Sequence, residues 1–225
     1  MIGTASLTVG TEELLLHPGR AVLWLRRKTI IAADTHFGKS SFFARHGIAV
    51  PAGSDDEDRA RLTMLVRESR AERVIILGDF LHAPIAGDSR EALDIEAWAL
   101  GLAPAQVMVV AGNHDRGTPR HSRSSILWRD DEWLEPPFRF IHDASSREAF
   151  DGAFTLSGHI HPVMRLHGLR KQHLRVPVFW QRKTGLVLPS FGTFTGGFAV
   201  RPRPGDRVFA VGPTAVARVI GYGRE

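Results

Sequence analysis

The chain has 225 residues, of which 43% are hydrophobic, and it carries a formal net charge of +5. This length and composition argue against disorder and favour one globular domain over residues 1–225 with a substantial core. No run reaches the length of about 20 apolar residues that a membrane-spanning helix needs, and no basic segment precedes an apolar run near the start, so we expect a cytoplasmic protein with no membrane association.

Three short apolar runs predict buried strands at residues 29–33, 74–77 and 107–111. Each is rich in β-branched side chains and ends in a charged or glycine-containing turn. Residues 55–70 and 89–100 lie between these strands and carry apolar side chains at helical spacing. The polar run that begins at Ser54 predicts a cap for the first of these helices. The alternation of strands and helices predicts an α/β layered fold.

Shorter segments predict a second sheet in the other half of the chain, at residues 138–141, 154–157, 176–180 and 185–188. Turns separate these segments, so we expect the second sheet to be more antiparallel than the first. The Gly- and Phe-rich residues 191–198 predict a tight turn between strands. The sequence shows no internal repeat, linker or low-complexity segment, which again favours one domain.

Polar side chains follow the first three predicted strands at the point where each strand stops. Asp34 and His36 follow the first strand. Asp79 follows the second strand, and Asn113 with His114 follows the third. Because ligands of open α/β sheets bind at the C-terminal edge of the strands, we expect these residues to converge although they are distant in sequence.

A lone histidine, His142, ends the predicted strand 138–141. A lone histidine is more often structural or exposed than a ligand. We nevertheless prefer it as a candidate ligand, because the competing histidines have no apolar run before them: His121, His167 and His173.

Two short segments, 34–36 and 159–161, each carry a pair of candidate ligands two positions apart. If these segments are extended, residues i and i+2 share one side of the backbone, and each pair points to one centre. The chain has no cysteine, so a metal bound at that centre must use His, Asp, Glu or Asn.

In chain order the motifs read D-x-H, G-D, G-N-H-D, a lone His and G-H-x-H, and from Asp34 to His161 the chain resembles the calcineurin-like metallophosphoesterases. The resemblance implies an α/β fold of two mixed β-sheets packed as a sandwich flanked by helices, and a phosphoesterase with two metal ions. It implies that one ion binds Asp34, His36 and His161, that the other binds Asn113, His142 and His159, and that Asp79 bridges both.

Imidazole and carboxylate ligands suit divalent transition metals, so we expect manganese, with iron, zinc or cobalt as alternatives. Two such ions about 3.5–4 Å apart can hold a bridging hydroxide as the nucleophile and polarise the phosphoryl oxygens.

The resemblance also implies catalytic roles for His114 and Asp115. His114 would face the phosphate and act on a phosphate oxygen or the leaving oxygen, and Asp115 would orient its ring by accepting a proton from the other ring nitrogen. The simpler interpretations are that His114 packs and Asp115 caps a turn.

Many family members read G-D-x-x-D where this chain has His82 in the last position. We expect His82 to hold a metal ligand in place without binding the metal itself.

Four longer strings resemble one bacterial branch of this family, the ligase-associated DNA-damage-response endonucleases, at residues 34–40, 47–51, 77–83 and 188–197. With these strings the resemblance extends over nearly the whole chain. It implies DNA as substrate and partner, a role in DNA repair, and functional association with an ATP-dependent DNA ligase.

Lys39 and Arg45 follow the first candidate ligands directly. They could meet backbone phosphates while Phe42 and Phe43 stack on a base. An ordinary amphipathic helix with both phenylalanines in the core is an equally good interpretation. The basic segment 165–175 fits either a phosphate-binding surface or a solvated loop.

Three functions stay open at this point. The first is a phosphodiesterase that acts on DNA as an endonuclease or end processor, which the excess of positive charge favours. The second is a small-molecule or cyclic-nucleotide phosphodiesterase. The third is a non-catalytic scaffold, which the presence of every candidate ligand and of His114 argues against.

Overall fold

Two β-sheets pack face to face in this computed structural model, which describes residues 2–48, 53–120, 124–145, 152–167 and 173–220. The first sheet has seven strands in the order β1-β2-β3-β4-β5-β6-β7, and nine strands form the second among the described residues. The first sheet contains β1 (Ala5–Val9), β2 (Glu12–His17), β3 (Ala21–Trp24), β4 (Thr29–Ala33), β5 (Arg73–Leu77), β6 (Gln106–Val110) and β7 (Leu127–Arg129). The second contains β8 (Glu132–Glu135), β9 (Phe138–Ile141), β10 (Phe154–Ser157), β11 (Pro162–His167), β12 (His173–Arg182), β13 (Gly185–Val187), β14 (Phe198–Ala199), β15 (Arg207–Val211) and β16 (Val216–Arg218).

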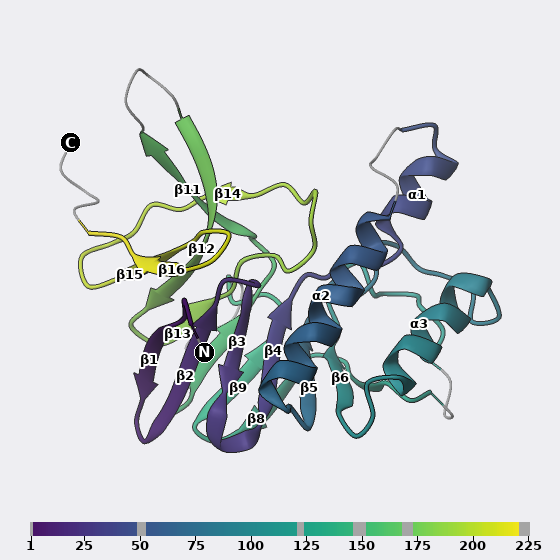
Figure 1. Cartoon of the computed structure of the whole chain (residues 1–225), viewed down its shortest axis with the longest axis horizontal. Helices are drawn as coiled ribbons and strands as arrows, with labels where there is room; N and C mark the ends of the chain where they lie inside the picture. The colour runs from purple at the N-terminus through teal and green to yellow at the C-terminus, as the bar shows by residue number, and fades with distance from the viewer. Residues whose placement is uncertain (1, 49–52, 121–123, 146–151, 168–172, 221–225) are drawn as a thin grey trace.

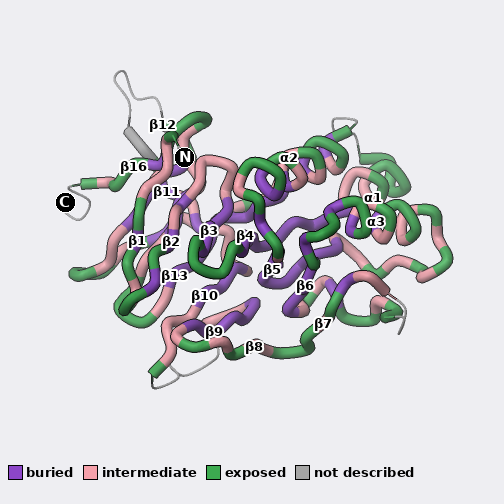
Figure 2. Tube along the Cα trace, turned by 60° about the horizontal axis from the view of Figure 1, so that its bottom comes forward, coloured by how far each residue is buried: buried purple, intermediate pink, exposed green. Residues whose placement is uncertain are grey.

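The central strands of the first sheet are the three that the sequence predicts, and they are parallel. Ala33 at the end of β4 lies beside Leu77 of β5, which lies beside Val110 of β6. Apolar residues of these strands belong to core clusters on both faces of the sheet, and Figure 2 shows β4 to β6 largely in the colour of buried residues. The three strands therefore end together at one edge of the sheet, and the polar residues after them share that edge.

Helices cover the outer face of the first sheet, as Figure 1 shows for α2 (Ser54–Ser69) and α3 (Arg90–Leu100). Leu62 and Leu65 of α2 and Ile95 of α3 belong to the core cluster shared with this face. The Oγ atom of Ser89 accepts a hydrogen bond from Ala92 at 3.2 Å and caps α3. The predicted cap at Ser54 is wrong, because Ser54 is already helical and follows Gly53 without a side-chain cap. The remaining helices are α1 (Lys39–Arg45) and a short 3-10 helix (Leu25–Arg27).

The core between the two sheets is aromatic. Trp24 of β3 is fully buried and meets Phe138 of β9 edge-on, with ring centroids 4.8 Å apart. Its indole N–H donates to Glu12 at 2.6 Å, so its polar atom is also satisfied. This contact fixes the second sheet against the first, and with it the positions of side chains at the end of β9.

The second sheet is mixed. β9, β10 and β13 are parallel neighbours, whereas β12 pairs antiparallel with β11, β13 and β15. The predicted α/β sandwich of two mixed sheets flanked by helices is confirmed, with the helices on the side of the first sheet. None of the helices in the described part of the chain is long and apolar enough to cross a membrane.

Candidate metal centre

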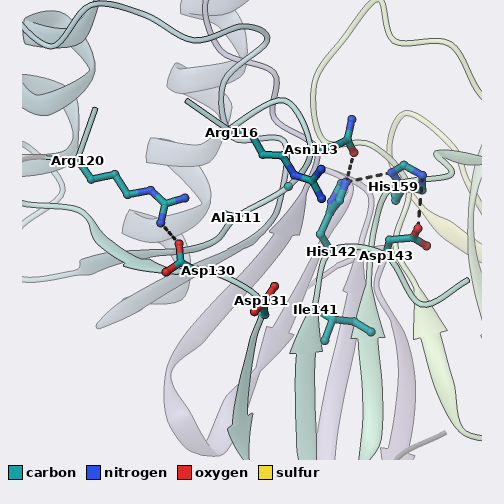
Figure 3. A pocket seen from close by; sticks show the side chains of 11 residues that line it. Ala111, Asn113, Arg116, Arg120, Asp130, Asp131, Ile141, His142, Asp143 and His159 are labelled. Atoms are coloured by element: carbon teal, nitrogen blue, oxygen red, sulfur yellow. Dashed lines mark hydrogen bonds and ion pairs between the residues drawn. The ribbon is translucent and has the colours of Figure 1, made fainter. Parts of the chain in front are cut away.

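The candidate ligands meet where β4, β5 and β6 end, and the ends of β9 and β10 reach the same place. Figure 3 shows part of this site above the ends of the strands, with Asn113, His142 and His159 directed toward one another. The structure thus brings together all seven residues that the sequence predicts as ligands.

The inner cluster consists of Asp34, His36 and His161, whose ligand atoms lie within 4.8 Å of one another. The Nε2 atoms of His36 and His161 are 3.4 Å apart, and Nε2 of His161 is 3.6 Å from Asp34 Oδ1. Burial, followed by the charges of His161 and His114, lowers the pKa of His36 to about 2. His36 is therefore neutral at physiological pH, which is the form that binds a metal.

The outer cluster consists of Asn113, His142 and His159. Nε2 of His142 lies 2.9 Å from Asn113 Oδ1 and 3.0 Å from His159 Nδ1. Nδ1 of His142 lies 3.1 Å from the carbonyl oxygen of Leu77. A proton donated to this carbonyl leaves the Nε2 lone pair of His142 free to face the cluster.

Asp79 joins the two clusters. Its Oδ2 lies 3.8 Å from Nε2 of His36, and its Oδ1 lies 3.5 Å from Nε2 of His142. Oδ1 also accepts a hydrogen bond from the backbone N–H of His114 at 2.9 Å. One carboxylate thus presents an oxygen to each cluster, as a bridging ligand must.

The spacing and chemistry of these atoms fit a dinuclear metal site. Metal–nitrogen distances of about 2.0–2.1 Å put adjacent ligand atoms about 3.0–3.4 Å apart. The observed nitrogen–nitrogen distances are 3.4 Å in the inner cluster and 3.0 Å in the outer cluster. Nδ1 of His36 is buried and has no hydrogen-bond partner among the described residues. Imidazole, carboxylate and amide donors without thiolates suit divalent transition metals.

Two glycines of the motifs are required by close packing at the centre. Gly78 has φ of +72°, and a Cβ there would overlap the ring of His142. A Cβ on Gly112 would overlap the backbone nitrogen of Asp79. The glycines before Asp79 and Asn113 therefore let the ligand-bearing loops approach one another.

The ligand pairs share one side for a different reason from the one the sequence predicts. The expectation of extended segments at 34–36 and 159–161 is wrong, because the four candidate ligands in these segments adopt left-handed backbone conformations. Their φ angles are +53° for Asp34, +47° for His36, +72° for His159 and +47° for His161. Such conformations cost about 1–3 kcal/mol each and persist where the surrounding structure imposes them.

The predicted contact between Asp115 and the ring of His114 is also wrong. The buried Asp115 carboxylate accepts backbone hydrogen bonds from Phe80, Leu81 and Gly112 at 2.8–3.2 Å. Burial raises the pKa of Asp115 despite these bonds. The ring of His114 is held instead by the carbonyl oxygen of His82, 2.6 Å from its Nδ1. Asp115 therefore ties together the loops that follow β5 and β6.

His82 supports the site through ring packing. Its ring stacks on His114 with centroids 5.5 Å apart and meets the edge of His36 at 5.5 Å. Its Nδ1 has no hydrogen-bond partner in the described structure. Burial, followed by the charges of Lys39 and His114, lowers its pKa to about 4. The nitrogens of His36, His82 and His114 also lie within 4.8 Å of one another, so three imidazole rings meet on this side of the inner cluster.

The two predicted substrate-binding residues lie in α1. Lys39 donates to the carbonyl oxygen of Phe194, and burial lowers its pKa. Arg45 pairs with Glu91 at 3.5 Å and lines a cavity whose lining contains none of the candidate ligands, so the structure does not bring it to the centre. Phe42 and Phe43 are half-buried and contact His82, which matches neither a core helix nor a free stacking surface.

Among the described residues, the groups that could hold a metal contain no histidine beyond His36, His82, His114, His142, His159 and His161. His121 lies outside the described residues, and so does part of the basic segment 165–175. The backbones of His167 and His173 pair with each other across β11 and β12.

Two residues at the outer cluster are not predicted from the sequence. Oδ2 of Asp143 lies 3.7 Å from Nε2 of His159, whose other nitrogen faces His142. Arg116 lines a cavity of about 450 Å³ together with Asn113, and Figure 3 shows its side chain directed toward His142. The only signal in the sequence is position: Asp143 directly follows His142, and Arg116 lies two residues after His114.

The model of the calcineurin-like phosphoesterase family matches residues 27–191, and the chain therefore belongs to this family. It is a metal-dependent phosphoesterase, and its His/Asp clusters are consistent with the dinuclear site of such an enzyme.

Among solved structures, the crystal structure of the Pseudomonas putida nuclease MPE is similar to nearly the whole chain. It is 31% identical, with a TM-score of 0.81, over 96% of this chain and 100% of that chain. YfcE, a phosphoesterase from E. coli, is 16% identical over 85% of this chain and 97% of that chain, with a TM-score of 0.41 that is too low for inference. No curated protein sequence matches this chain.

Proposed function

We propose that this chain is a phosphodiesterase that cleaves DNA strands at the centre formed by the inner and outer clusters. The observation that carries the proposal is the position of Asp79 between the two clusters, with one carboxylate oxygen toward each. Two ions held in this way, with manganese as the proposed metal, would supply an activated water and neutralise the charge of a phosphodiester. The proposed inner ligands are Asp34, His36 and His161, the proposed outer ligands are Asn113, His142 and His159, and Asp79 serves both.

His114 is the proposed proton donor. Its Nδ1 lies 2.6 Å from the carbonyl oxygen of His82, which fixes the ring so that Nε2 faces the centre, 4.0 Å from Asp79 Oδ2. The side chain is 40% exposed, so it can reach a bound substrate. A protonated Nε2 there can stabilise a phosphate oxygen or protonate the leaving oxygen. Asp115 and His82 hold this arrangement in place.

DNA as the substrate is supported by the similar nuclease structure and by cationic side chains around the site. Arg116 lies in the cavity beside the outer cluster, and Arg20 and Arg175 lie in the cavity beside His161. Lys39 donates to the carbonyl oxygen of Phe194, a residue that lines the cavity beside His161. Guanidinium groups on both sides of a metal centre can hold the phosphates that flank a scissile bond.

The proposal also includes a role in DNA repair in the cytoplasm and functional association with an ATP-dependent DNA ligase. The repair role and the ligase association rest on the resemblance to the ligase-associated branch, and the compartment rests on the sequence pattern near the start of the chain.

A panel of substrates tests the proposal. We expect the manganese-loaded protein to cleave a single-stranded or nicked oligonucleotide and to lose this activity with a chelator. A terminal phosphomonoester and a 2′,3′-cyclic nucleotide serve as the comparisons. Brisk hydrolysis of the cyclic nucleotide without cleavage of any oligonucleotide would contradict the proposal and identify a small-molecule phosphodiesterase.

A further inference from the structure

The loop of residues 191–197, which joins the end of the second sheet's β13 to β14, is tied to the inner cluster. The backbone N–H of Gly192 donates to the carbonyl oxygen of Asp34 at 3.1 Å. The carbonyl oxygen of Gly196 lies 3.2 Å from Nδ1 of His161, whose Nε2 faces Asp34. The loop therefore orients a proposed metal ligand through its other ring nitrogen.

Charged side chains bind the backbone of this loop, among them Arg20, which donates to the carbonyl oxygen of Gly192, and Arg61, which donates to that of Phe191. Lys39 of α1 donates to the carbonyl oxygen of Phe194, and Arg175 of β12 donates to that of Gly197. Asp58 of α2 accepts from the backbone N–H of Thr193 at 2.7 Å. The loop is thus held from both sides of the site.

Phe194 is an exception to the usual rules for a bulky residue. It has φ of +54°, in the left-handed region, and 59% of the residue is exposed to solvent. A left-handed phenylalanine is strained, and an exposed ring gains little from burial. The contacts of the loop impose this conformation, and it brings no benefit to packing. Strain of this kind is concentrated at ligand-binding sites.

Phe194 and His161 both line a cavity of about 320 Å³. This volume lies within the range of about 300–1,000 Å³ that small-ligand sites occupy. Two guanidinium groups, of Arg20 and Arg175, line the same cavity, and no carboxylate is among its described lining residues. An aromatic face beside cationic groups matches a nucleobase joined to a phosphate.

We propose that this cavity binds the nucleotide next to the scissile phosphate, with its base stacked on Phe194 and its distal phosphate held by Arg175 and Arg20. The inference rests on the proposed action on DNA and extends it, because it names a subsite for a single-stranded nucleotide. Stacking tolerates every base, so the subsite selects unpaired strands without selecting sequence.

Binding of a single-stranded oligonucleotide that contains 2-aminopurine tests the subsite. The measurement uses manganese-loaded protein with His114→Ala, so that cleavage does not interfere. We expect Phe194→Ala to weaken binding by about 5- to 100-fold, the loss typical of one base-stacking contact. Stacking on Phe194 should quench the fluorescence of 2-aminopurine at one position of the strand, and this quenching should be lost in Phe194→Ala. Phe194→Tyr, which keeps the aromatic face, should restore both.

The matched control is Phe198→Ala. Phe198 is 62% exposed and lies four residues further along the same segment, but it does not line the cavity. We expect Phe198→Ala to bind the oligonucleotide within about twofold of the affinity of the parent, which is the manganese-loaded His114→Ala protein. A further readout is Arg175→Gln, which should reduce the slope of log K against log salt by about 0.7, the value for one phosphate contact on a single strand.

The outcomes separate the two proposals. If the parent protein binds no oligonucleotide at low salt, both the proposed function and the subsite are overturned. If the parent binds but Phe194→Ala behaves like Phe198→Ala, the subsite alone is overturned. Weaker binding and lost quenching in Phe194→Ala, both restored by Phe194→Tyr, support the subsite.

Discussion

The inner and outer clusters offer similar donors but differ in their exposure to solvent. In the inner cluster, the side chains of His36 and His161 are 5% and 17% exposed, and that of Asp34 is fully buried. In the outer cluster, the side chain of His159 is 36% exposed and Asn113 is exposed.

This difference has a physical consequence for metal binding. The inner donors are already dehydrated and fixed by their neighbours, so an ion there gains coordination with little further ordering. In the outer cluster His142 is buried as well, but Asn113 and His159 must give up water and become ordered when they bind. We therefore expect the inner position to bind an ion more tightly, and the outer position to exchange its ion more readily.

Removal of the shared carboxylate should weaken metal binding at both the inner and the outer position. Asp79→Ala leaves two cations without their common ligand, and we expect activity to fall by more than about 1,000-fold, since stabilisation by the ions is worth several kcal/mol. Metal content measured by mass spectrometry should fall at both positions. Asp79→Asn, which keeps the acceptor for the His114 N–H, controls for loss of the fold; metal binding unchanged in both variants would refute the bridging role.

Removal of the proposed proton donor should leave both clusters intact. His114→Ala should reduce turnover by about 100-fold or more while both ions remain bound. His46→Ala, an exposed histidine of the same chain, should change neither quantity. Loss of metal together with turnover in His114→Ala would show that His114 belongs to the ligand set.

A change at Asp143 should affect the two clusters unequally. In the described structure the Asp143 carboxylate lies 3.7 Å from Nε2 of His159 and bonds to Ser145, and its polar contacts include no inner ligand. Asp143→Asn should weaken the outer ion by about 10- to 100-fold and leave the inner ion unchanged, as loss of a supporting carboxylate does. Asp130→Asn, which changes an acidic residue of the same cavity, should have no such effect. Equal weakening at both positions would contradict the proposed division of ligands.

Asp115 should influence both clusters only through stability. Asp115→Ala leaves three buried backbone N–H groups without their acceptor, and we expect a loss of about 3 kcal/mol in the free energy of unfolding by urea. Asp88→Ala, at an exposed position in the loop after β5, should change it by less than about 0.5 kcal/mol. An Asp115→Ala protein that keeps its stability but loses turnover would contradict this and indicate a direct role for Asp115 in catalysis.

The central strands could be predicted from the sequence because their apolar β-branched runs stop abruptly at polar residues. The N-terminal strands β1 to β3 have no such ending and were not predicted. The candidate ligands could be predicted by type and spacing, but their left-handed backbones could not, because loop packing around Gly78 and Gly112 imposes them. The places of Asp143 and Phe194 likewise depend on contacts between distant segments.

A calorimetric titration of the metal-free protein with manganese tests the central claim most directly. The account predicts that each chain binds two ions in two resolved steps, with the tighter step lost in His161→Ala and the weaker step lost in His159→Ala. Binding of a single ion per chain, or equal loss of both steps in either variant, would contradict the assignment of two clusters that share Asp79.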